Sequence, residues 1–251
     1  MTYCIALRLD TGLVFLSDTR TNAGVDNISS YRKMHVLIDE PDRLLVLQSA
    51  GSLATTHEVL DRIEADLRRS RAGAELTSLA TVEDLSQAAL YVGRLNREVT
   101  ESHAAALPSG TAGATFILGG QIGEEDADIL LVYSEGNYIR ASRDKPYLQI
   151  GESKYGKFLL DLGVRDDTPL ETATKIAVAS MISTARANLS VGPPYDLGVY
   201  IPDGYLLQHF RIEARSTMLA ELGALWERHV REAFADLPRV AMDLEPLPEE
   251  A

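Results

Sequence analysis

The sequence predicts an α+β fold in which two β-sheets lie between helical layers, with an additional C-terminal helix. The predicted elements occur in blocks of strands, two helices, strands, two helices and a final strand pair, so they do not alternate as in a parallel α/β fold. Apolar residues recur with period two or in continuous runs in the strands, and at helical spacing in the helices. No linker-like segment interrupts the 251 residues, which indicates that both halves share one core.

The first half contains four predicted strands followed by two predicted helices. Tyr3, Ile5 and Leu7 alternate with smaller or more polar residues, as in a half-buried strand. The continuously apolar run at 13–16 predicts a strand buried on both faces that ends at Asp18. The remaining elements are expected as strands at 31–38 and 44–49 and helices at 53–69 and 82–99, the last with Thr81 and Asp84 in a capping box.

The second half repeats this order after a loop at 107–113. Strands are expected at 115–118, 128–134, 138–141 and 147–150, helices after residue 153 and after Thr168-Pro169, and a hairpin at 195–210.

We expect residues 1–212 to form one domain and residues 213–236 a C-terminal helix. The apolar stripe of that helix, which includes Leu222 and Trp226, fits either packing on its own domain or a subunit contact. Residues 237–251 read as an acidic, proline-rich tail.

Composition restricts the classes of function. The formal net charge is -13, from 37 acidic and 24 basic residues, which argues against a nucleic-acid or anionic-membrane partner. The lone cysteine, Cys4, reads as a small buried apolar residue, and the five histidines are scattered, so we expect neither a metal nor a cofactor. The sequence has no signal-peptide pattern and no long apolar run, so we expect a cytoplasmic protein.

Three polar residues lie at the boundaries of apolar strands: Thr2, Asp18 and Lys33. A threonine with a free α-amine is a nucleophile that carries its own base. A nearby lysine would stabilise the ionised hydroxyl, an aspartate would keep that lysine charged, and the Gly51 N–H would stabilise an oxyanion. Each residue also has a purely structural explanation, since aspartate caps turns and lysine extends from strand ends.

The order and spacing of these residues resemble proteasome-type β-subunits of the N-terminal nucleophile hydrolases, and most closely the bacterial Anbu (ancestral β-subunit) family. The residues that carry the resemblance are Thr2, the run Ser17-Asp18-Thr19-Arg20-Thr21-Asn22-Ala23-Gly24, Lys33, and Ser49-Ala50-Gly51. The resemblance extends to about residue 210. It implies an αββα four-layer sandwich and a homo-oligomer, either a ring or a spiral, with an ATPase as a candidate partner.

The resemblance also implies further site residues. Thr21, Asn22 and Ala23 would bind a substrate strand through main-chain pairing. Ser153 and Ser190 match the two serines that lie beside the terminal amine in such subunits. Ala187 stands where those subunits have an aspartate, and Asp196 is a candidate substitute.

We therefore expect a threonine hydrolase that cleaves peptide or amide bonds through an acyl-enzyme. Activity requires a free Thr2 amine, and we expect maturation to need only the removal of Met1. Two alternatives remain open at this point: a scaffold protein of the same fold with a weak or vestigial site, and an amidohydrolase that acts on small amides.

Overall fold

The computed structural model describes residues 2–22, 28–106, 112–202 and 204–238, and it confirms the predicted α+β sandwich. Two five-stranded antiparallel sheets form the centre of the described part. The first sheet has the order β10 (Tyr147–Gly151), β1 (Tyr3–Leu9), β2 (Gly12–Asp18), β11 (Tyr195–Ile201), β12 (Leu206–Ile212). The second has the order β5 (Met34–Glu40), β6 (Arg43–Gly51), β7 (Ala114–Ile122), β8 (Asp128–Val132), β9 (Tyr138–Arg140).

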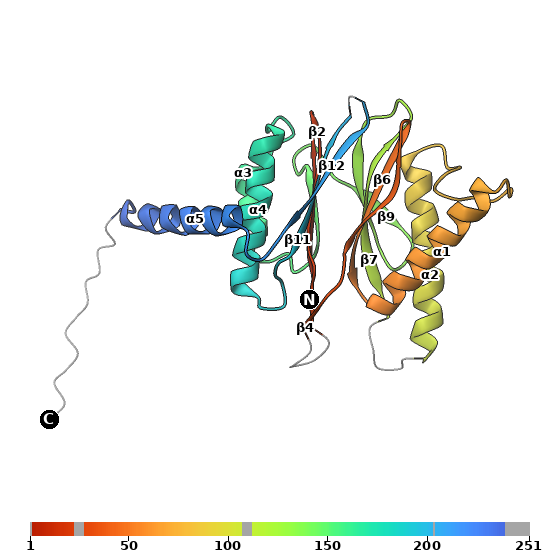
Figure 1. Ribbon diagram of the computed structural model, residues 1–251, viewed down its shortest axis with the longest axis horizontal. Coiled ribbons are helices and arrows are strands. Elements are labelled where there is room, and N and C mark those ends of the chain that lie inside the picture. Colours follow the sequence, from red (N-terminus) through yellow and green to blue (C-terminus); the bar gives the residue numbers. More distant parts are fainter. Residues whose placement is uncertain (1, 23–27, 107–111, 203, 239–251) are drawn as a thin grey trace.

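Helices cover the outer face of each sheet (Figure 1). They are α1 (Leu53–Arg71) and α2 (Leu85–Ala106) on the second sheet and α3 (Lys157–Gly163) and α4 (Leu170–Ala187) on the first. Three apolar layers result: one under α1 and α2, one between the sheets, and one under α3 and α4. This is the four-layer αββα arrangement that the resemblance implies.

Strand β1 is buried on both faces, which corrects the expectation of a half-buried strand. Tyr3, Ile5 and Leu7 pack toward α4, whereas Cys4 and Ala6 face the other sheet. Cys4 and Ala6 are small and look less apolar in the sequence, but only small side chains leave room for the second sheet at this position. The expected role of Cys4 as a small buried residue agrees with its complete burial.

Three local boundaries differ from the sequence expectations. The segment after Asp18, expected to be a loop, contains a two-stranded ribbon of β3 (Arg20–Asn22) and β4 (Ile28–Ser30). The strand expected at 31–38 begins only at Met34, which leaves Lys33 just outside it. Thr81 belongs to a turn with Ser78, and Asp84 alone caps α2 by accepting the Gln87 N–H.

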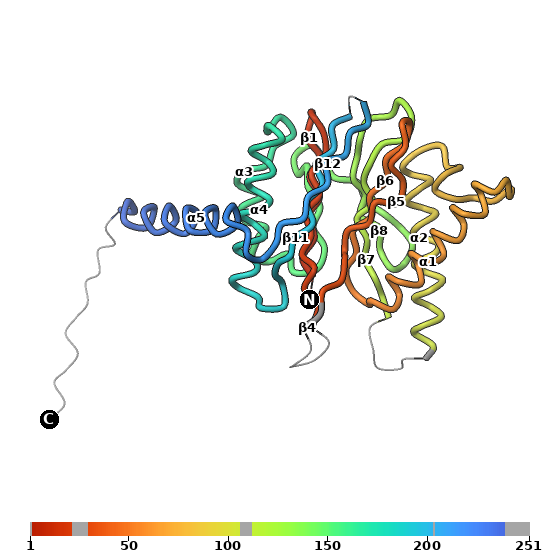
Figure 2. Tube along the Cα trace, in the orientation of Figure 1, coloured from red at the N-terminus to blue at the C-terminus, as the bar shows by residue number. Residues whose placement is uncertain are grey.

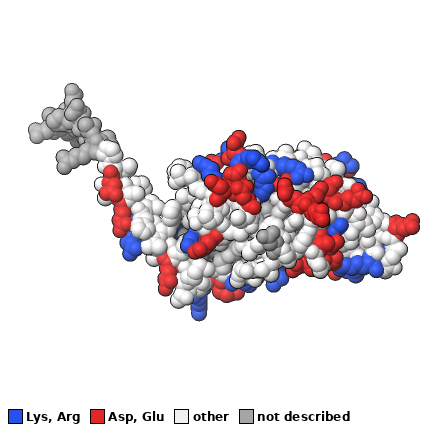
Figure 3. Space-filling view, turned by 90° about the horizontal axis from the view of Figure 1, so that it is seen from above, with Lys and Arg blue, Asp and Glu red and all other residues white. Residues whose placement is uncertain are grey.

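Helix α5 (Thr217–Ala235) contacts the body through its N-terminal part and through an ion pair between Glu227 and Arg186 of α4. Leu219 and Leu222 pack against the core under α4, and Gly223 is the one residue of α5 that is buried. The helix then extends away from the sandwich (Figure 1). On the face drawn in Figure 3, acidic and basic side chains lie interspersed, and α5 extends from one end of the body. None of the described helices is long and apolar enough to cross a membrane.

Candidate active site

The chain begins at the end of the first sheet, beside the ribbon of β3 and β4 (Figure 2). Thr2 directly precedes β1, and its carbonyl oxygen accepts a hydrogen bond from the Glu152 N–H at 2.6 Å. Gly151 permits this close approach, because a Cβ at that position would lie 2.0 Å from the Thr2 oxygen. Its φ of +83° is also one that glycine adopts without strain. Thr2 is therefore fixed by β10 and the turn that follows it.

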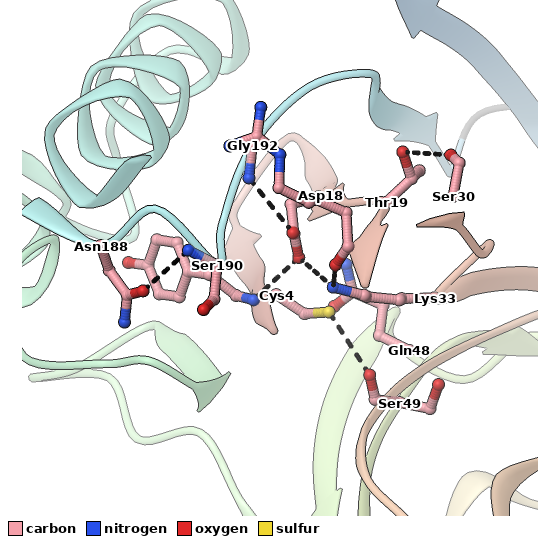
Figure 4. A network of polar contacts seen from close by, with 12 residues as sticks. Cys4, Asp18, Thr19, Ser30, Lys33, Gln48, Ser49, Asn188, Ser190 and Gly192 are labelled. Atoms are coloured by element: carbon pink, nitrogen blue, oxygen red, sulfur yellow. Dashed lines mark hydrogen bonds and ion pairs between the residues drawn. The ribbon is translucent and has the colours of Figure 1, made fainter. Parts of the chain in front are cut away.

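Asp18 and Lys33 form a buried ion pair next to Thr2 (Figure 4). The Asp18 Oδ1 accepts from the Lys33 Nζ at 2.7 Å and from the Tyr3 N–H at 2.9 Å. The Lys33 Nζ also donates to the Arg20 carbonyl oxygen at 2.7 Å. One carboxylate oxygen thus joins the lysine to the peptide between Thr2 and Tyr3, which places a buried ammonium beside the N-terminal residue.

Burial governs the electrostatics of this pair. The Asp18 side chain is 0% exposed and that of Lys33 is 7% exposed. Burial raises the pKa of Asp18, while the Lys33 ammonium and the N–H groups of Tyr3 and Gly192 offset part of that rise. A desolvated carboxylate with several donors is a rigid anchor, so the ammonium is held in one place.

Gly51 ends β6, at the position that the sequence predicts for oxyanion stabilisation. It is exposed and has a φ of +107°, and a Cβ there would lie 2.5 Å from the Gly113 oxygen. A hollow of about 370 Å³ lies between Gly51 and Gly151. Its other lining residues are all uncharged: Ala50, Thr115, Leu131, Tyr133, Gln149 and Ile150. The two glycines thus border one hollow, and Gly151 is also the residue packed against the Thr2 oxygen.

The loop after α4 is attached to the same site at several points. The Gly192 N–H donates to the Asp18 Oδ2 at 3.3 Å, and the Pro194 oxygen accepts from the Thr19 hydroxyl at 2.8 Å. Arg20 donates to the Leu189 oxygen at 2.9 Å, and its guanidinium lies over Gly192, where a Cβ would come within 2.3 Å of the Arg20 Cζ. The loop, Asp18 and β3 therefore form one connected unit.

Asn188 carries the polar side chain at the end of α4, and sequence reasoning did not identify it. Its Oδ1 accepts from the Ser190 N–H and its Nδ2 donates to the Glu152 Oε2, each at 2.9 Å. The exposed Ala187 only ends the helix. An asparagine two residues before a serine is a common turn signal, which is the one feature of the sequence that points to this residue.

Two other sequence candidates, Ser153 and Asp196, lie on the first sheet and in the turn beside it. Ser153 is half-buried beyond Gly151, and in this turn it is Glu152 that makes the hydrogen bonds to Thr2 and to the α4 loop. Asp196 lies in β11 opposite Ser17 and pairs with Arg211 at 3.3 Å. It is therefore a partner of β12, whereas Asn188 occupies the end of α4 where the substitute was sought.

The expected substrate-binding residues are described only in part. Thr21 lies in the middle of β3, opposite Ser29. Asn22 ends β3, and Ala23 lies outside the described residues, as does Met1. In the part of the chain that the structure describes, no three His, Cys, Asp or Glu side chains converge as metal ligands would.

Of the comparisons with known proteins, the one with solved structures identifies a family. A scan against protein-family models and a search of the curated proteins find no match. Among solved structures, Anbu (ancestral β-subunit) from Yersinia bercovieri is 40% identical with a TM-score of 0.88, over 96% of this chain and 99% of that chain. Anbu from Hyphomicrobium sp. strain MC1 is also 40% identical, with a TM-score of 0.86 over 96% of this chain and 100% of that chain.

A third structure is the helical assembly of the Anbu complex from Pseudomonas aeruginosa, at 37% identity and a TM-score of 0.87 over 95% of this chain and 98% of that chain. Identity at this level across nearly the full length of each chain is far more than a shared fold requires. The chain therefore belongs to the Anbu (ancestral β-subunit) family, whose fold is of the proteasome type.

Proposed function

We propose that this protein is an N-terminal threonine hydrolase that cleaves peptide or amide bonds. The observation that carries the proposal is the Asp18 carboxylate, which binds the Tyr3 N–H and the Lys33 ammonium with the same oxygen. A buried lysine that is fixed one peptide from a terminal threonine has a clear chemical use, because it stabilises the Thr2 alkoxide as that forms.

The reaction follows from this arrangement. The Thr2 Oγ1 attacks the carbonyl carbon of the scissile bond, and its proton moves to the free α-amine. The Gly51 N–H stabilises the oxyanion of the tetrahedral intermediate. The intermediate then expels the leaving amine, which takes the proton from the α-ammonium and leaves an ester on Thr2. Water hydrolyses this ester, with the α-amine again as the base.

The hollow beside Gly51 suggests the class of substrate. Its eight lining residues are uncharged, so a charged substrate group placed there would lose hydration without gaining a partner. We propose that the group next to the scissile bond is uncharged, and that the edge of β3 around Thr21 pairs with the extended substrate.

The test begins with protein whose first residue is confirmed as Thr2 by intact mass. A panel of fluorogenic peptides and a peptide epoxyketone, which reacts with N-terminal threonine, report turnover and adduct formation. Thr2→Ala should abolish both while leaving the circular dichroism spectrum unchanged, and Thr2→Ser should retain part of each. Turnover by Thr2→Ala equal to that of the wild type would exclude the proposal.

A second candidate function is that of an assembly protein, which the exposed apolar side chains of α5 favour. Leu225 and Phe234 are 47% and 68% exposed, and the Pseudomonas aeruginosa relative is described as a helical assembly. We propose that this chain also forms a homo-oligomer, since heterologous contacts give rings or spirals. Assembled protein that retains Met1 and forms no adduct would favour the scaffold function over catalysis.

A further inference from the structure

The turn after β10 and the loop after α4 are joined by one side-chain contact, between Glu152 and Asn188. Glu152 is also tied to the N-terminal residue, because its own N–H donates to the Thr2 oxygen. The Glu152 backbone thus lies directly beside Thr2, and a single asparagine fixes where the Glu152 carboxylate lies.

The direction of the contact follows from its chemistry. The Asn188 Oδ1 accepts from the Ser190 N–H, which can only donate. The Asn188 Nδ2 therefore faces Glu152 as a donor, and the Glu152 carboxylate is the acceptor. Asn188 is itself held by α4, since its backbone N–H donates to the Thr184 oxygen at 2.9 Å.

The other charged groups near Thr2 are arranged differently. Asp18 and Lys33 are paired with each other, and Arg20 donates to the Leu189 carbonyl oxygen. Lys154 follows Glu152 in the chain and is exposed. Because Glu152 is bound by the neutral Asn188 side chain, a hydrogen bond from a protonated Thr2 amine to Glu152 would leave the buried Asp18–Lys33 pair intact.

We infer that Glu152, held by Asn188, positions the Thr2 α-amine and sets its protonation state. This inference rests on the proposed function, in which that amine is the base. The carboxylate accepts a hydrogen bond from the amine, so the nitrogen lone pair points away from Glu152 and toward the Thr2 hydroxyl. Pairing with the ammonium form raises the pKa of the amine, which makes it a stronger base at the cost of needing a higher pH for deprotonation.

Two substitutions should move the amine in opposite directions. Glu152→Gln removes the negative charge and should lower the pKa of the Thr2 amine by about 0.5 to 1 unit. Asn188→Asp keeps the acceptor for the Ser190 N–H but adds a second carboxylate, so it should raise that pKa by a similar amount. Glu125→Gln is the matched control, since Glu125 is exposed and distant in the fold.

The measurement is the chemical shift of the ¹³C-methylated Thr2 amine as a function of pH, on protein of confirmed N-terminal mass. It needs no turnover, so it remains informative even if the proposed function fails. The acid limb of epoxyketone labelling, measured on unmodified protein, should shift with the same two signs. Amine pKa values for Glu152→Gln and Asn188→Asp that both equal the Glu125→Gln value would overturn the inference. Shifts of equal sign in the two variants would show a purely structural contact and would also overturn it.

Discussion

Removal of the Lys33 charge tests whether the Asp18–Lys33 pair contributes to both stability and activity. In Lys33→Met, Asp18 remains fully buried with two donors, the N–H groups of Tyr3 and Gly192 at 2.9 and 3.3 Å. Loss of one partner of a buried ion pair costs about 3 to 5 kcal/mol. Because these donors remain and burial already favours protonation of the carboxyl, we expect the lower end, about 3 kcal/mol.

The double variant separates charge pairing from catalysis. Asp18→Asn alone leaves the ammonium with the Arg20 oxygen and should also cost about 3 kcal/mol. Asp18→Asn combined with Lys33→Met leaves no buried charge, so its loss should fall short of the sum of the single losses by about 2 to 3 kcal/mol. Urea unfolding followed by far-ultraviolet circular dichroism, at matched protomer concentration, measures these free energies of unfolding.

In the double variant, the activity should remain lost although part of the stability is regained. All three variants should fail to react with the epoxyketone, since none combines a charged lysine with the carboxylate that fixes it. If the double variant loses as much stability as the two single variants together, Asp18 and Lys33 do not stabilise each other as a buried ion pair. Wild-type labelling by Lys33→Met would refute the role of the ammonium.

Two further predictions concern neighbouring residues. Gly151→Ala places a Cβ 2.0 Å from the Thr2 oxygen, so it should lower the free energy of unfolding by at least about 2 kcal/mol and abolish epoxyketone labelling. The control is Gly73→Ala, at a φ of +90° in open space, which should lower the free energy of unfolding by only about 1 kcal/mol. Burial lowers the pKa of His35 to about 4, so folding favours its neutral form. Stability should therefore fall as pH decreases from about 6.5 to 4, by about 1 to 2 kcal/mol at this half-buried site, and His35→Leu should remove that part of the acid dependence of urea unfolding.

The sequence predicts the strand-end residues because each interrupts an apolar run. Asp18 ends a buried strand, and Lys33 precedes a strand that begins with an apolar residue, so a charge stands out at each position. Gly51 is visible for the same reason, since it follows the apolar β6 and precedes a helix. Local patterns of this kind predict where a strand ends, whereas the resemblance to proteasome-type subunits predicts which of these residues lie together.

Contacts between distant loops leave no such pattern. Asn188 and Glu152 are 36 residues apart, and each is an ordinary polar residue in a turn. The ribbon of β3 and β4 was missed for a related reason, because Arg20-Thr21-Asn22 is polar throughout and pairs through its backbone. In β1, Cys4 and Ala6 look like the less buried positions, and only the presence of a second sheet explains their burial.

Asp18 shows why loss of activity alone cannot assign a catalytic residue here. Its carboxylate accepts hydrogen bonds from the Tyr3 N–H in the first strand and from the Gly192 N–H in the loop after α4. Gly192 is 174 residues from Asp18 in the sequence, so this carboxylate joins distant segments of the chain. Any substitution at Asp18 therefore disturbs the fold and the site together. Thr2 lies outside β1 and is partly exposed, so replacing its side chain removes the nucleophile with little change in packing. The decisive comparison is between Thr2→Ala and the Asp18–Lys33 double variant, because only the former should lose activity at full stability.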